Sequence, residues 1–282
     1  MEMLDPRVDF VFKRIFASES NKDVLLAFLN RIFMDAGDPP LEEVVLLNPY
    51  TDKDDPLDKQ AIFDIWAKTV DGKLINVEMQ LFNKYDIEKR TLYYWSKRYA
   101  GQLQVSGKYA DLKKCVTINI LNYKVLPNEH THSVFHLRED VTGAPLTDDI
   151  EIHFLELPKL NQPVIPGEGG LANWLLFLKG VHYSDWEVLQ MNEPALRKAM
   201  ETLEFLSQDS EARRKYEDRQ KFLLDEVSQR DGAQREGFAK GKAEGQLEAK
   251  REIARNLLAI GMAPAAVQQA TGLSEEELKS MT

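Results

Sequence analysis

Asp64, Glu78 and Gln80 are the residues of this chain whose types and spacing best suit chemistry. Each interrupts an apolar stretch: Asp64 lies in AIFDIWAKTV, and the other two lie in LINVEMQLF. Side chains alternate across a strand, so Glu78 and Gln80 share a face about 7 Å apart. A carboxylate in a buried strand is costly unless a positive group accompanies it. These residues therefore require either a metal ion or a basic side chain nearby.

The two apolar stretches predict neighbouring antiparallel strands, because Asp71-Gly72 between them is a strong hairpin turn. Counted outward from that turn, Asp64 is seven residues away and Glu78 is six, so a bulge or an uneven turn would bring them side by side. Two carboxylates form an oxygen site suited to Mg²⁺, Mn²⁺ or Ca²⁺, and the backbone carbonyl of Met79 could add a ligand. Such an ion can activate water and stabilise charge on a phosphate.

The surrounding charges leave two interpretations open. The net charge of -10 argues against a polyanionic partner. Residues 84–114, however, carry eight Lys or Arg against three Asp or Glu. A basic helix there could hold the phosphates of a polyanion, although a solvated helix face is the simpler alternative. Either carboxylate alone could also form an ordinary ion pair, with Arg90 or Lys59 as the candidates.

The elements that must position these residues follow from hydrophobic patterning. Two helices come first, and a strand, the hairpin, a long helix and three more strands follow. The expected ranges are helices at 5–16, 21–33 and 85–103, and strands at 42–50, at the hairpin, and at 115–123, 132–140 and 151–160. This order predicts an α/β domain with a mixed sheet.

The C-terminal part of the chain is helical and charged. An apolar helix is expected at 171–181, a charged helical segment follows at 193–230, and a soft boundary falls near 190. Gly237, Gly241 and Gly245 would line one helix face. This spacing indicates either a weak helix or a close helix–helix contact.

Residues 261–282 have the outline of a helix-turn-helix. Pro264 suits a helix start, Thr271-Gly272 suits a turn, and Ser274 with Glu277 forms a capping box. The second helix, EEELKSM, is short and acidic, which favours packing or self-association over reading DNA bases.

Several segments together resemble the Rpn family, recombination-promoting nucleases also described as putative transposases, within the PD-(D/E)xK nuclease superfamily. They are DFVFKRIF near the N-terminus, the block 58–123, and the tail GMAPAAVQQATGLSEEELKSM. FDI followed by VEMQ is similar to the D…ExK signature, with Gln80 in the lysine position. The resemblance implies a restriction-endonuclease-like αβββαβ core, flanked by helices, with a helical C-terminal extension. It also implies a metal-dependent DNA endonuclease that uses Mg²⁺, with Mn²⁺ or Ca²⁺ as alternatives.

The resemblance assigns roles to particular residues. Asp64 and Glu78 would bind the metal, and Gln80 would orient water or phosphate. Asp9 and Lys13 in the first helix could support the site, although Asp9 is also a common helix-start charge. Residues that could touch DNA lie on the basic helix: Lys89, Arg90, Tyr94, Lys97 and Arg98. For Tyr94, the alternative to DNA contact is a place in the hydrophobic core.

Gln80 also raises a second functional interpretation. Glutamine is uncharged, so it cannot act as a base or replace the electrostatic effect of an ammonium group. The alternative is a catalytically decayed DNA-binding or protein-interaction module with oligomerising C-terminal helices.

Three regions and a set of partners are expected. Residues 1–190 form the nuclease-like domain, 191–230 a charged helical segment, and 231–282 a helical module for self-association, with a dimer favoured. DNA is the expected partner, and the role is recombination, transposase-like activity, or toxin and defence.

Cys115 is the single cysteine, so an internal disulfide is excluded, and Cys115 is expected to be a core residue. Without a membrane span or signal peptide in the sequence, a cytoplasmic protein is expected.

Overall fold

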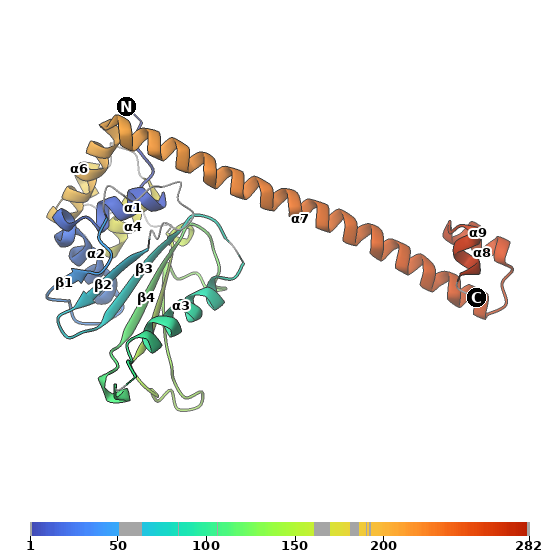
Figure 1. The fold of residues 1–282 in the computed structure, drawn as a ribbon, viewed down its shortest axis with the longest axis horizontal. Helices are drawn as coiled ribbons and strands as arrows, with labels where there is room; N and C mark the ends of the chain where they lie inside the picture. The colour runs from blue at the N-terminus through green and yellow to red at the C-terminus, as the bar shows by residue number, and fades with distance from the viewer. Residues whose placement is uncertain are drawn as a thin grey trace. The chain divides into compact units, whose positions relative to one another are not determined.

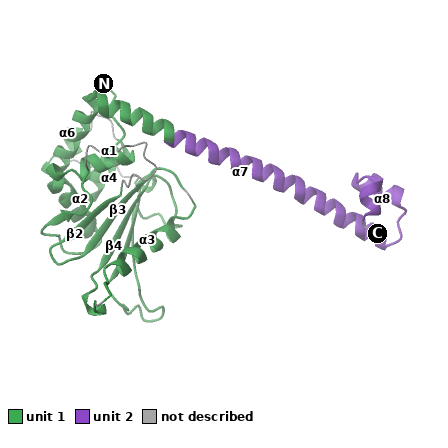
Figure 2. Ribbon diagram, viewed as in Figure 1, with its two compact units in different colours: residues 1–222 green, residues 223–282 purple. Residues whose placement is uncertain are grey.

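A computed structural model of the chain describes residues 2–50, 64–83, 85–105, 107–160, 170–180, 186–189, 191 and 193–280. Its contacts group the chain into two compact units, Met1–Phe222 and Leu223–Thr282 (Figure 2). The region boundaries expected near residues 190 and 230 stay predictions. No helix within the described ranges is long and apolar enough to cross a membrane.

The first unit is a mixed sheet with helices on both faces (Figure 1). Its elements follow the predicted order of two helices, three strands, one helix and three strands. The strands are β1 (Val44–Leu46), β2 (Ile65–Thr69), β3 (Leu74–Gln80), β4 (Cys115–Leu121), β5 (His132–His136) and β6 (Ile150–Glu156). The α-helices are α1 (Asp9–Phe16), α2 (Lys22–Asp35), α3 (Ile87–Gly101), α4 (Leu171–Lys179), α5 (Trp186–Leu189), α6 (Pro194–Gln208) and the beginning of α7 (Ser210–Ala259).

The strand order is β1-β2-β3-β4-β6-β5. Strands β1, β2 and β3 are antiparallel to their neighbours, β3, β4 and β6 run parallel, and β5 is antiparallel to β6. Strand β3 is therefore antiparallel to one neighbour and parallel to the other. Helix α3 forms the crossover that the parallel pair β3–β4 requires. These observations confirm the predicted α/β, restriction-endonuclease-like mixed sheet.

The β2–β3 hairpin has a three-residue loop, 70–72, which makes the turn uneven. The backbone N–H of Thr69 donates to the Lys73 carbonyl at 3.0 Å, and that of Gly72 donates to the Thr69 carbonyl at 3.0 Å. Gly72 has φ of +92°, which favours glycine. The resulting register pairs Ile65 with Val77. Continued by one residue, it sets Asp64 opposite Glu78.

The two faces of the sheet differ in character. One face carries the apolar core and packs on α1, α2, α4 and α6; its strand residues include Ile65, Ala67, Ile75, Val77, Val116, Ile118 and Ile120. The other face lies under α3, whose Thr91 hydroxyl donates to Asn119 Oδ1 at 3.1 Å. Trp95 Nε1 of the same helix donates to the Cys115 carbonyl at 3.0 Å. Helix α3 buries only Ile87 and Thr91, so its remaining side chains stay accessible.

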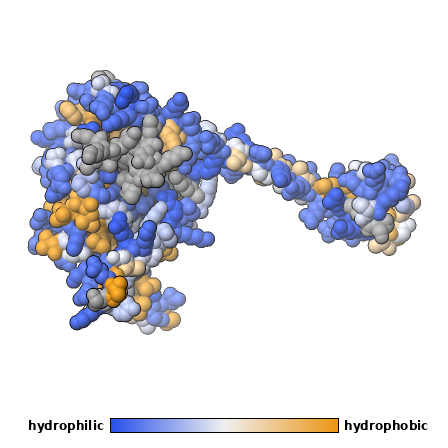
Figure 3. All heavy atoms as spheres, viewed as in Figure 1, coloured by the Kyte–Doolittle hydropathy of each residue, from blue (hydrophilic) through white to orange (hydrophobic). Residues whose placement is uncertain are grey.

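The visible surface of the first unit is largely hydrophilic, with apolar side chains gathered over the sheet edge that carries β1 (Figure 3). Exposed apolar residues of this edge include Val45 and Leu47, each with 49% of its surface exposed. Side chains at these two positions turn away from the core, because side chains alternate along a strand and the alternating residues Val44 and Leu46 are the buried ones.

The predicted charged helix is divided at Asp209 into α6 and α7. Its carboxylate accepts from the Ala212 backbone N–H at 2.7 Å, which caps the start of α7. Helix α7 then continues through the glycine run to Ala259. A Cβ placed on Gly237, Gly241 or Gly245 would meet nothing within 4 Å, so the described part of the chain supplies no close partner for this face.

The second unit ends in a small helical cluster. Helices α8 (Pro264–Thr271) and α9 (Glu275–Lys279) pack on the end of α7 around Ala254, Val267, Leu273 and Leu278. The predicted capping box is present: the Glu277 N–H donates to Ser274 Oγ at 3.2 Å, and the Ser274 N–H donates to Glu277 at 2.8 Å. The sequence outline of a helix-turn-helix is therefore confirmed.

Candidate functional site

Two carboxylates face each other across the β2–β3 hairpin. Asn48 positions the first one: its Nδ2 donates to the Asp64 carbonyl at 2.8 Å, and its Oδ1 accepts from the Trp66 N–H at 2.7 Å. Glu78 is 9% exposed. Burial and, to a smaller extent, the nearby charge of Glu78 together raise the pKa of Asp64 to about 6, against smaller opposing effects that include the charge of Arg98. The pair is thus a partly desolvated site whose negative charge is balanced only in part.

Two neutral amides hold the Glu78 carboxylate. Asn76 Nδ2 donates to its Oε1 at 3.3 Å, and Gln80 Nε2 donates to its Oε2 at 3.0 Å. Asn76 is 1% exposed, and its Oδ1 has no hydrogen-bond partner among the described residues. These contacts orient Glu78 without neutralising it.

The ion-pair alternative for the carboxylates finds no support in the described ranges, where Arg90 forms no salt bridge with Asp64 or Glu78. Lys59, the other candidate, lies outside the described residues.

The backbone carbonyl of Met79 points toward the side of β3 on which Asp64 lies. The Gln80 carbonyl accepts from the Asn122 N–H at 3.0 Å, so it points toward the β4 side of the strand. Carbonyls of successive strand residues point to opposite sides. The Met79 carbonyl therefore points toward β2, on the side of Asp64, as a third ligand oxygen would.

Helix α3 presents a basic and aromatic flank toward β2. Arg90, Tyr94 and Arg98 recur every four residues and so share one flank. The guanidinium carbon of Arg90 lies 5.9 Å from the centre of the Tyr94 ring, and that of Arg98 lies 3.7 Å from the centre of the Trp66 ring in β2. Tyr94 is 38% exposed, so it is not the core aromatic that was the alternative.

The other two basic residues predicted to touch DNA, Lys89 and Lys97, are exposed on α3. They lie one residue before Arg90 and Arg98, so they project from a different part of the helix surface.

Asp9, at the start of α1, is engaged by the beginning of α7. Arg219 Nε donates to both Asp9 carboxylate oxygens at 3.1 Å, and Arg219 Nη2 binds Oδ2. Close by in sequence, Arg7 Nη1 donates to Asn122 Oδ1 at 2.8 Å. Asn122 in turn donates its N–H to the Gln80 carbonyl. The start of α1 is thus tied to the end of β3.

Lys13 of α1 was the second supporting residue expected from the sequence. It is 4% exposed and lies on the buried side of its helix. A buried ammonium needs polar partners, and Lys13 does interact with other groups of the chain.

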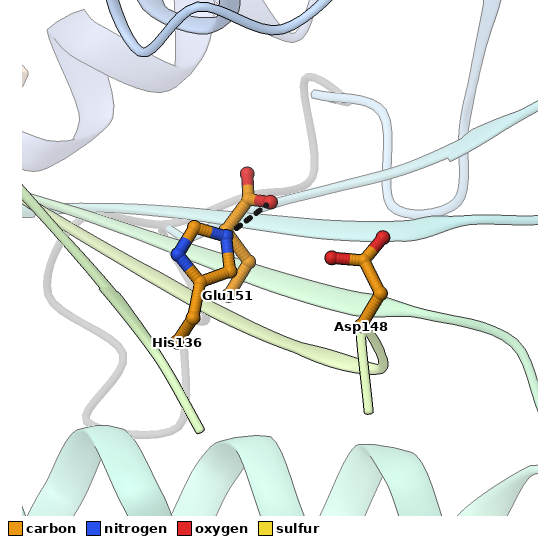
Figure 4. Close-up of side chains that lie close together, drawn as sticks. All are labelled: His136, Asp148 and Glu151. Carbon is orange, nitrogen blue, oxygen red and sulfur yellow. Dashed lines mark hydrogen bonds and ion pairs between the residues drawn. The ribbon is translucent and has the colours of Figure 1, made fainter. Parts of the chain in front are cut away.

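A second polar cluster lies on the apolar-core face of the sheet, and the sequence reasoning missed it. His136, Asp148 and Glu151 each offer a ligand atom within 4.8 Å of the others (Figure 4). However, Lys114 Nζ lies 2.6 Å from Glu151 Oε2 and 2.9 Å from Asp148 Oδ2. Its ammonium already compensates both carboxylates, so a metal ion would have to displace it. The arrangement fits an ion-pair network better than a metal site.

This network continues through two more histidines. His153 Nε2 lies 2.6 Å from Glu151 Oε1, its Nδ1 lies 2.8 Å from His132 Nε2, and His132 Nδ1 lies 2.6 Å from Asp35. Burial alone would raise the pKa of Glu151, but the bonds from His153 and Lys114 outweigh it and lower this pKa to about 2. The alternation of Glu151 and His153 in EIHFLE was the available sequence signal, because it places both on one face.

A mixed sheet with an αβββαβ order of elements, and with Asp64 just before β2 opposite Glu78 on β3, agrees with the arrangement expected of a PD-(D/E)XK nuclease. Residues 6–233 match the family model described as PD-(D/E)XK nuclease family transposase. Residues 247–282 match the model described as Rpn/YhgA-like nuclease family, C-terminal HTH domain. The chain therefore belongs to the PD-(D/E)XK nuclease family transposases, and its resemblance to the Rpn family is confirmed. No curated protein and no solved structure gives a significant match.

Proposed function

We propose that the protein is a divalent-metal-dependent endonuclease that hydrolyses phosphodiester bonds in DNA. The observation that carries the proposal is the pair Asp64 and Glu78, set opposite each other with no salt bridge to a basic residue in the described ranges. Like charges held together at partial burial are costly unless a cation binds between them. Membership of a nuclease family agrees with this interpretation.

The residues fit a hard divalent cation. Asp64, Glu78 and the Met79 carbonyl would supply oxygen ligands for Mg²⁺, with Mn²⁺ or Ca²⁺ as alternatives. When bound, such an ion lowers the pKa of water and stabilises negative charge on a phosphate. The neutral donors Asn76 and Gln80 hold Glu78 in place while leaving its charge available.

The chain's own residues would bind and orient the substrate. In this proposal Gln80 orients Glu78, and its amide is also placed to meet water or a phosphate oxygen. The basic residues of α3 and the ring of Tyr94 would contact the DNA backbone. These residues are Lys89, Arg90, Tyr94, Lys97 and Arg98. Contacts of this kind make binding dependent on salt. Asp9 and Lys13 would support the site through α1.

Plasmid nicking tests the proposal. Wild type should nick supercoiled plasmid when Mg²⁺ or Mn²⁺ is added, and Glu78→Ala should abolish this activity. Glu42→Gln is a matched control, since Glu42 is an exposed carboxylate in the loop before β1. Cleavage by Glu78→Ala at the wild-type rate would exclude Glu78 from the reaction.

A second function, a decayed DNA-binding or protein-interaction module, is favoured by one observation, the uncharged Gln80. The two functions differ in metal binding. Millimolar Mg²⁺, Mn²⁺ or Ca²⁺ should raise the melting temperature of a nuclease that binds the ion in its native state. A melting temperature unchanged by all three ions, together with an intact plasmid, would favour the decayed module.

We also propose that the C-terminal helices mediate self-association, with a dimer favoured. No described side chain between residues 223 and 253 is buried, and a helix polar on all sides gains little stability from its own chain. Light scattering of the full chain and of a chain lacking 231–282 tests this. Equal masses corresponding to one chain in both would refute it. A simultaneous change of mass and activity would favour a toxin-like or defence role under C-terminal control, rather than a purely recombinational one.

A further inference from the structure

The proposed site lacks the positive charge that a lysine two residues after Glu78 would provide. Gln80 occupies that position, and Asn76, the other side chain on Glu78, is also neutral. Negative charge grows on the phosphate during hydrolysis, and fixed positive groups near it contribute strongly to the rate. A cation from another element would restore this effect.

We propose that Arg98 of helix α3 supplies this charge and acts as a catalytic residue by binding the phosphate that a divalent ion at Asp64 and Glu78 would hold. This inference rests on the proposed nuclease function. It assigns Arg98 a role in the chemical step, beyond a general contact with the DNA backbone.

The position of Arg98 is set by Trp66. Its guanidinium carbon lies 3.7 Å from the centre of the Trp66 ring, and Trp66 is 7% exposed. Trp66 is two residues from Asp64 on the same face of β2, which is about 7 Å along the strand. Trp66 also pairs with Asn76, which itself touches Glu78. The guanidinium therefore lies over the same face of the sheet as the carboxylate pair, near enough for its charge to act on Asp64.

Stacking on an indole ring leaves the guanidinium suited to phosphate. The ring face holds it by cation–π attraction, which uses none of its five N–H donors. No carboxylate in the described ranges forms a salt bridge with Arg98. A positioned guanidinium that forms no salt bridge can bind two phosphate oxygens at once.

Three other cations of the sheet and of α3 are less well placed. Arg90 lies eight residues before Arg98 on α3, and its guanidinium carbon is 5.9 Å from the centre of the Tyr94 ring. Lys68 shares the face of Asp64, but four residues along a strand separate them by about 14 Å. Lys114 is bound to Glu151 on the opposite face of the sheet.

A charge-relocation experiment tests the assignment. Four variants are compared with wild type: Arg98→Gln, Arg98→Lys, Lys97→Gln and the double change Arg98→Gln with Gln80→Lys. Lys97→Gln is the matched control, since it removes one exposed positive charge from the neighbouring position of α3. DNA affinity is measured in EDTA, and single-turnover cleavage is measured with Mn²⁺ at saturating DNA. Melting temperatures establish that each variant is folded.

Arg98→Gln should lower the single-turnover rate on the order of 100-fold, the effect of removing one oxyanion-stabilising group. Its loss of affinity should not exceed that of Lys97→Gln. Gln80→Lys should recover at least about tenfold of the lost rate, because it restores a positive charge at the same phosphate. Arg98→Lys should fall between wild type and Arg98→Gln.

Two results would overturn the assignment while leaving the nuclease proposal intact. One is a wild-type rate for Arg98→Gln at saturating DNA. The other is a rate loss in Arg98→Gln that Gln80→Lys does not recover at all. A wild-type protein that binds DNA but cleaves none with any of the three ions would instead refute the nuclease function, and the assignment with it.

Discussion

Replacing Asp64 with asparagine distinguishes a metal site from an ordinary structural ion pair. In the metal-free protein, Asp64 lies beside Glu78 and partly out of water, and both effects raise its pKa to about 6 from the ordinary value of 3.8. Ionised Asp64 therefore destabilises the folded state. Asparagine has nearly the same shape, keeps an acceptor oxygen and carries no charge, so Asp64→Asn should stabilise the metal-free protein at neutral pH.

The size and sign of the effect follow from linkage. A native pKa above the unfolded one means that the folded protein binds the proton more tightly, so stability falls as pH rises between the two values. A difference of about 2 units corresponds to at most about 3 kcal/mol, and solvent at this partly accessible group reduces that figure. The advantage of Asp64→Asn should be absent near pH 3.8, grow up to about pH 6, and stay constant above it.

Urea unfolding in EDTA, at about pH 4 and about pH 7.5, measures this difference directly. Adding Mg²⁺ or Mn²⁺ to a parallel series should stabilise wild type and leave Asp64→Asn unchanged, since only the former keeps both carboxylates. An Asp64→Asn protein that is less stable than wild type at pH 7.5 would refute the reasoning, because it would show that a positive group already compensates Asp64.

Four further predictions concern the rest of the first unit. Lys114→Met should cost roughly 3 kcal/mol of unfolding free energy at neutral pH, because it leaves the buried Glu151 uncompensated; an unchanged urea midpoint would contradict this. In wild type, the stability contributed by ionised Glu151 should be present above pH 4.5 and be lost as pH falls toward about 2. Arg219→Met should lower the stability of the first unit by about 2 kcal/mol, since Asp9 loses its bidentate partner, and equal denaturation curves would rule out a structural role for the contact. Burial raises the pKa of Cys115 to about 11, so a thiol reagent at about pH 8 should label the native protein far more slowly than the urea-unfolded chain; equal labelling rates would show that the thiol is accessible.

The sequence was informative wherever the determining contacts are local. Asp71-Gly72 and the alternation around it predicted the hairpin, and the hairpin alone brings Asp64 and Glu78 together. The order of elements through β6 also followed from local apolar patterns. Helix α3 was recognised from its own composition, including Arg90 and Arg98, which line one flank.

The features that escaped prediction depend on contacts between distant segments. Strand β5 precedes β6 in the chain yet lies outside it at the sheet edge, which no local pattern specifies. The stack of Arg98 on Trp66 joins residues 32 positions apart, and its existence depends on how α3 packs. The bond between Arg219 and Asp9 spans 210 positions.

Helix α7 illustrates a different difficulty. Each glycine costs a helix up to about 1 kcal/mol relative to alanine, so the glycine run indicated weakness. The helix nevertheless continues from Ser210 to Ala259, since straight-chain charged residues and alanine surround the glycines and favour helix.

The double pairing of β3 has a consequence for how the protein acquires its site. The antiparallel partner of β3 lies across a three-residue loop, so Asp64 and Glu78 approach each other through a contact of short loop length, of the kind that forms in microseconds. The parallel partner requires the whole α3 crossover, and Arg98 reaches Trp66 only when that longer loop closes. The negative half of the site is thus expected to form before its positive half. A nascent chain that ends before β4 would carry two repelling carboxylates with no cationic helix docked above them, and divalent ions in the solution could stabilise this hairpin before the sheet is complete.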